Sequence, residues 1–136
     1  MNQLVNASVP REWAHCFIGH KVWARPHDAP GIQPADWMEL VDHVVQSRGD
    51  GMDSHCLILG TKQGLAWCFA ARSLYIQGVN QHECTHLPDI TPNWWEWNPP
   101  SETPPPARKV ADIEGLVREL AGKDQHVLGQ FALFAI

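Results

Sequence analysis

The chain has 136 residues, of which 44% are hydrophobic and 18% are charged, and its formal net charge is −5 at pH 7. This composition excludes wholesale disorder, and the length predicts a single domain over residues 1–136. The negative charge argues against nucleic acid as a direct ligand, because phosphate binding needs clustered Lys and Arg.

The first predicted element is a strand over residues 13–23, where aromatic and aliphatic residues alternate on both faces. A helix is predicted next, over residues 34–47. Pro34 suits the first helical position, and Gly49 suits the stop. One apolar face of a helix has the spacing i, i+3, i+4, i+7. Four residues of this segment have that spacing: Trp37, Leu40, Val41 and Val44.

A hairpin is predicted from residues 55–60 and 65–77, with "TKQG" as the turn between them. The apolar residues of the second arm match neither the strand period nor the helix period cleanly, so a helix remains an alternative for that arm. A second amphipathic helix is predicted over residues 112–121, with Asp112 as its N-cap. Residues 126–136 are predicted to form a strand buried on both faces.

These elements predict an α+β fold. Its parts are a mostly antiparallel sheet, two amphipathic helices packed on that sheet, and one long acidic loop rich in Trp and Pro, at about residues 78–108. No Lys or Arg occurs between Arg72 and Arg108, whereas seven of the eleven prolines and three of the seven tryptophans do. Aromatic side chains are costly to leave in water, so we expect this loop to pack on its own sheet or on a partner.

The loop supplies the predicted binding residues. We expect a small non-catalytic binding protein, of the inhibitor, immunity or anti-defence type, that engages a basic surface of a partner protein. Aromatic enrichment and negative charge are typical of such a contact. The residues expected to make it are Asp89, Trp94, Trp95, Glu96, Trp97 and Glu102.

The stretch "QHECTH" raises a metal-binding alternative. On an extended segment His82, Cys84 and His86 would point to one side, and zinc accepts both residue types. Glu83 would then point away from the metal, which makes it a poor general base. The usual zinc spacings are missing, so no cofactor is expected. The alternative is a zinc-dependent enzyme or a zinc-stabilised sensor.

No catalytic residues are predicted, because the usual phosphate-binding and hydrolase motifs are missing from the sequence. A second alternative is a small-molecule binder with a pocket walled by Trp residues. No apolar run approaches the roughly 20 residues of a membrane span, and no secretory signal is recognisable. We therefore expect a cytoplasmic protein with reduced thiols at Cys16, Cys56, Cys68 and Cys84.

Overall fold

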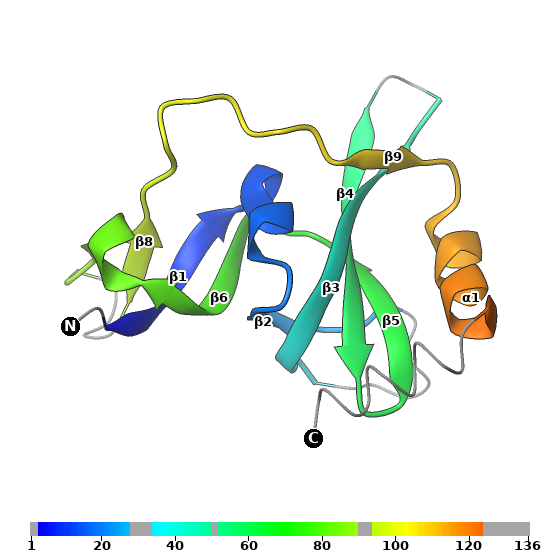
Figure 1. Ribbon diagram of the computed structural model, residues 1–136, viewed down its shortest axis with the longest axis horizontal. Helices are drawn as coiled ribbons and strands as arrows, with labels where there is room; N and C mark the ends of the chain where they lie inside the picture. The colour runs from blue at the N-terminus through cyan, green and yellow to red at the C-terminus, as the bar shows by residue number, and fades with distance from the viewer. Residues whose placement is uncertain (1–2, 28–33, 50–51, 90–93, 124–136) are drawn as a thin grey trace.

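The computed structural model describes residues 3–27, 34–49, 52–89 and 94–123. Nine strands, two 3-10 segments and one α-helix form over these residues (Figure 1). In chain order they are β1 (Leu4–Pro10), η1 (Arg11–Phe17), β2 (Lys21–Ala24), β3 (Asp36–Ser47), β4 (Asp53–Thr61), β5 (Gly64–Phe69), β6 (Ser73–Asn80), η2 (Gln81–Glu83), β7 (Cys84–His86), β8 (Trp95–Trp97), β9 (Arg108–Val110) and α1 (Ile113–Lys123).

The strands join in one sheet with the order β5-β4-β3-β2-β6-β1-β8-β7, and β9 pairs with β3 beside this path. The pairing is largely antiparallel, as the sequence predicts. Within the described residues the parallel pairs are β1 with β8 and β3 with β9. Strand β3 is therefore central, because its first part pairs with β2, its second part with β9, and most of its length with β4.

The α+β prediction with two packed helices is wrong, because residues 36–47 form β3 instead of a helix. A β-bulge between Leu40 and Asp42 explains the misleading pattern. Strand residues on one face are normally two apart, but a bulge inserts one extra residue and makes that spacing three. Val41 and Val44 thus both pack on the same hydrophobic core although they are three residues apart, which mimics an i, i+3 pair. Pairing with the neighbouring strands overrides local helix propensity.

Two further elements differ from the prediction. The expected strand over residues 13–23 splits into η1 and the short strand β2. In η1 the buried residues follow a helical spacing, and they are Trp13, Ala14 and Phe17. The predicted hairpin is confirmed for β4 and β5. Its second arm ends at Phe69, however, and residues 73–80 form β6, which pairs with β1 and β2.

The helix predicted over residues 112–121 is confirmed as α1, which packs on β5. Its Ile113 and Val117 belong to a second core with Cys56, Ile58 and Trp67. The main core lies on the other side of β4, around Leu57 and Leu59. Strand β4 is thus buried on both faces. The strand predicted over residues 126–136 lies outside the described residues.

The acidic segment at residues 78–108 contains η2, β7 and β8 before it reaches β9. Between β8 and β9 the chain runs through the upper part of Figure 1, from β8 near one end of the sheet to β9 beside β3. Trp97 anchors this segment, since its side chain is only 7% exposed. Its ring centroid lies 5.5 Å from that of Trp13 and 5.2 Å from that of Phe17, both in edge-on contacts.

Replacing Trp97 with Ala is expected to lower the free energy of unfolding by about 3–5 kcal/mol, because it leaves a cavity against η1. Chemical denaturation measures the change. Trp23→Ala is the matched control. Trp23 is 44% exposed, and we expect its loss to cost only about 1 kcal/mol from its aromatic contact. Equal losses in the two variants would contradict the anchoring role of Trp97.

Candidate functional site

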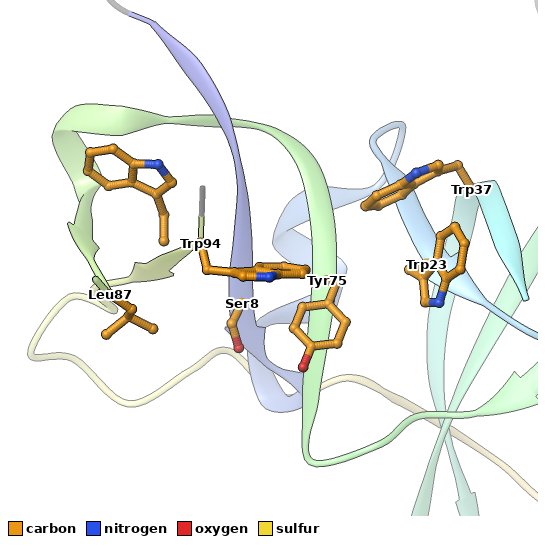
Figure 2. Close-up of a pocket in the computed structure, with 7 residues that line it drawn as sticks. Ser8, Trp23, Trp37, Tyr75, Leu87 and Trp94 are labelled. Carbon is orange, nitrogen blue, oxygen red and sulfur yellow. The ribbon is translucent and has the colours of Figure 1, made fainter. Parts of the chain in front are cut away.

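An aromatic cavity of about 400 Å³ lies on the outer face of the sheet. Apart from one serine and one leucine, the residues that line it are aromatic. In Figure 2 the ring of Trp94 lies between Leu87 and Tyr75, and Trp23 and Trp37 lie on the far side of Tyr75. The lining residues are Ser8, Trp23, Trp37, Tyr75, Leu87, Trp94 and Trp95.

Strand register brings the cavity residues together from distant parts of the sequence. Trp23 pairs with Trp37 across β2 and β3, and Tyr75 pairs with Ser8 across β6 and β1. The pairing of Val22 with Ile76 places β2 beside β6 and so joins the two pairs in one row. Along each strand the neighbouring residues point into the main core, which leaves this row on the opposite face.

The rings of the aromatic cavity contact one another in two pairs. The ring centroids of Tyr75 and Trp94 are 4.5 Å apart, and those of Trp23 and Trp37 are 5.3 Å apart. Trp23 is 44% exposed and Tyr75 is 42% exposed. Both rings therefore offer apolar surface to whatever fills the cavity. Trp95 has a double role, because it also packs partly against the main core.

The carboxylate of Glu96 lies beside the row of cavity residues. Glu96 on β8 pairs with Ser8 on β1, so its side chain projects from the same face as that of Ser8. Glu96 is exposed, and it also pairs with exposed Thr85 on β7. Of the residues that the structure describes, those that line the cavity carry no formal charge. The site thus combines neutral aromatic walls with the carboxylate of Glu96 at its margin.

A second cluster, the histidine row, consists of His15, His43 and His55. Nδ1 of His43 lies 2.9 Å from Nδ1 of His15, and Nε2 of His43 lies 2.9 Å from Nδ1 of His55. The central ring stacks on both neighbours, with centroids 5.1 Å apart in each case. His43 pairs with Leu57, so the row lies on the core side of the sheet, away from the aromatic cavity.

Burial determines the charge state of the histidine row. His43 is only 1% exposed, and a neutral imidazole can donate to one neighbour and accept from the other. Burial, followed by the charges of His55 and His15, lowers the pKa of His43 from 6.5 to about 4. Burial, followed by the positive charge of Arg11, also lowers the pKa of His55. The row is therefore neutral at its centre at physiological pH.

The histidine row predicts acid sensitivity. Because the pKa of His43 is about 4 in the folded protein and 6.5 in the unfolded chain, only the unfolded chain gains a proton between these values. Stability is full above about pH 6.5 and is lost as the pH falls towards about 4. We expect His43 alone to remove about 2 kcal/mol between pH 7.5 and pH 5, measured by denaturation at each pH.

His43→Asn should flatten this pH dependence, whereas the control His82→Asn, at an exposed position, should leave it unchanged. If His43→Asn does not fold, NMR titration of the wild-type imidazole provides the same test. A His43 ring that takes up its proton near the pKa of an ordinary histidine would contradict the assignment.

The "QHECTH" stretch does not extend as one strand. His82 lies in η2, whereas Cys84 and His86 lie in β7, so the three side chains do not share one strand face. Cys84 Sγ donates to the carbonyl of Asn80 at 3.4 Å, and the ring of His86 contacts that of Trp95. Over the ranges that the structure describes, no three His, Cys, Asp or Glu side chains group as a metal site would require.

The four cysteines are free thiols. Burial, followed by the charge of Cys56, raises the pKa of Cys68 to about 12. Burial is also the main cause that raises the thiol pKa of Cys16, Cys56 and Cys84. Since the thiolate is the reactive form, these residues are poor nucleophiles at neutral pH.

The predicted binding residues fall in three places. Trp94 and Trp95 line the aromatic cavity, and Glu96 stands beside it. Asp89 and Glu102 are exposed, and Trp97 is buried in the main core. Sequence reasoning missed the other cavity residues and the histidine row. Reading residues 36–47 as a strand would have placed Trp37 opposite Trp23, but the bulge hid that signal. The residues missed at the cavity are Ser8, Trp23, Trp37, Tyr75 and Leu87.

No family model, curated protein or solved structure matches this chain. Among the residues described, no helix has both the length and the apolar character needed to cross a membrane.

Proposed function

We propose that this protein is a non-catalytic binding protein and that the aromatic cavity is its ligand site. The observation that carries the proposal is the cavity of about 400 Å³ with five aromatic side chains in its wall. That volume falls within the roughly 300–1,000 Å³ of ligand pockets. The half-exposed rings of Trp23 and Tyr75 favour the same conclusion, because a ligand would remove their apolar surface from water.

The chemistry of the wall favours binding over catalysis. A general base or nucleophile must lie within hydrogen-bond reach of the reacting atom. Among the described residues that line the cavity there is no carboxylate, imidazole, thiol or amine. Ser8 supplies a hydroxyl, but the histidine row that could activate such a group lies on the core side of the sheet.

The expected ligand binding can be measured through the indole N–H signals of the tryptophans. Small apolar fragments such as indole should shift the NMR signals of the four cavity tryptophans. The indole N–H signals of Trp13, Trp67 and Trp97 should not shift, because these rings lie in the two cores. The signals expected to move are those of Trp23, Trp37, Trp94 and Trp95.

Tyr75→Ala should weaken fragment binding about tenfold or more, because hot-spot aromatic residues carry about 2 kcal/mol or more each. Phe69→Ala is the matched control, since Phe69 is also an exposed aromatic residue, 44% exposed, and does not line the cavity. Binding that shifts all seven tryptophans alike, or that survives Tyr75→Ala, would contradict the proposal.

A partner protein with a basic surface is the second candidate, of the inhibitor, immunity or anti-defence type. The exposed acids Asp89, Glu96 and Glu102 favour it, because residues 73–107 contain no Lys or Arg. A cytoplasmic location belongs to this proposal and is supported by the four free thiols.

Capture of a partner from host lysate should weaken as salt rises and should fall with Glu96→Lys. Salt-independent capture would count against it.

A further inference from the structure

We infer that the ligand of the aromatic cavity carries an alkylated ammonium cation, such as a trimethylammonium group. The inference rests on the proposed ligand-binding function and names the chemical class that the cavity would select. It follows from three features of the site: the arrangement of the rings, the position of Glu96, and the shortage of other polar groups in the wall.

The rings stand at different angles around the cavity. The planes of Trp23 and Trp37 meet at 70°, and those of Tyr75 and Trp94 meet at 52°. A flat neutral ligand stacks best between parallel rings, whereas a rounded alkylammonium group can contact several differently oriented rings at once. The negative potential of each ring face attracts such a cation, most strongly at Trp.

Glu96 supplies a formal negative charge on the same side of the sheet. It follows the lining residue Trp95 on β8 and pairs with the lining residue Ser8, so it can attract a cation without itself lining the apolar space. Two basic residues, Lys21 and Arg25, lie two positions before and after Trp23, and the alternation along β2 puts Lys21 on the same face as Trp23. Lys21 lies directly opposite Glu39 in the β2–β3 pairing, and Arg25 lies beyond the end of β2. Neither of them lines the cavity.

The wall disfavours the other common ligand classes. An anion would need Lys, Arg or clustered backbone N–H donors, and the described part of the wall includes no basic side chain. A sugar would need several convergent hydrogen-bonding groups, whereas aromatic rings and Leu87 form most of this wall. An alkylated ammonium group needs few hydrogen bonds, because its charge is covered by methyl groups and is recognised by ring faces.

The test compares choline with 3,3-dimethylbutan-1-ol, which has the same shape but a carbon atom in place of the charged nitrogen. We expect choline to bind at least about tenfold more tightly, followed by the indole N–H signals of the cavity tryptophans. Equal or weaker binding of choline overturns the cation assignment.

Variants separate the charge from the rings. Glu96→Gln should weaken choline binding by roughly threefold at low salt and leave binding of the neutral alcohol unchanged. Glu102→Gln is the control, because Glu102 is exposed in the segment between β8 and β9. Trp94→Leu keeps an apolar wall but removes a ring face, and should reduce the preference for choline over the alcohol. An unchanged preference in Trp94→Leu overturns the part assigned to the rings.

The outcome also separates this inference from the function on which it rests. If indole or the neutral alcohol binds in the cavity and choline does not, the cation assignment fails and the ligand-binding function stands. If none of the three probes shifts the signals of the cavity tryptophans, both fail. Wild-type-like NMR spectra of each free variant show that lost binding is not lost folding.

Discussion

The packing of Trp97 against Trp13 and Phe17 holds the aromatic cavity in place. These three rings connect β8 to η1, and η1 contributes three residues to the main core. Strand β8 is only three residues long and pairs with β1 through two registered residue pairs. Backbone pairing of this length is weak alone, so the buried Trp97 ring fixes where Trp95 and Glu96 lie. The cavity wall and its acidic margin depend on that contact.

The alternation of side chains along the strands separates the histidine row from the aromatic cavity. On the core side, η1 brings His15 against His43, and the three imidazoles form a hydrogen-bonded row away from the cavity. On the outer side, Trp23, Tyr75 and Ser8 stand opposite that core and remain open to solvent or ligand. The first arrangement suits stability near neutral pH, because it keeps His43 uncharged. The second suits recognition, because its apolar surface is left uncovered.

Both candidate functions use the same margin of the molecule. A small cationic ligand would contact the aromatic rings, and a basic partner protein would contact the exposed acids around Glu96. These contacts differ in physical character. Ring contacts exclude water and depend little on salt, whereas exposed carboxylates act at longer range and are screened by ions. The salt dependence of binding therefore tells which of the two surfaces dominates.

The sequence alone was enough to predict elements whose signals are local. Helix α1 has a helical apolar stripe, and the β4–β5 turn has its own turn residues, so both were predictable. The aromatic character of the acidic segment indicated packing on the sheet or on a partner, but only the structure shows that Trp97, expected at the binding surface, is buried in the main core. Only the tertiary structure decided that residues 36–47 form a strand, because a bulge made strand spacing look helical. The tertiary structure also brought together the residues of the aromatic cavity and of the histidine row. Their residues come from strands and a 3-10 turn far apart in the chain, and register between those elements is a long-range property that local sequence patterns do not encode.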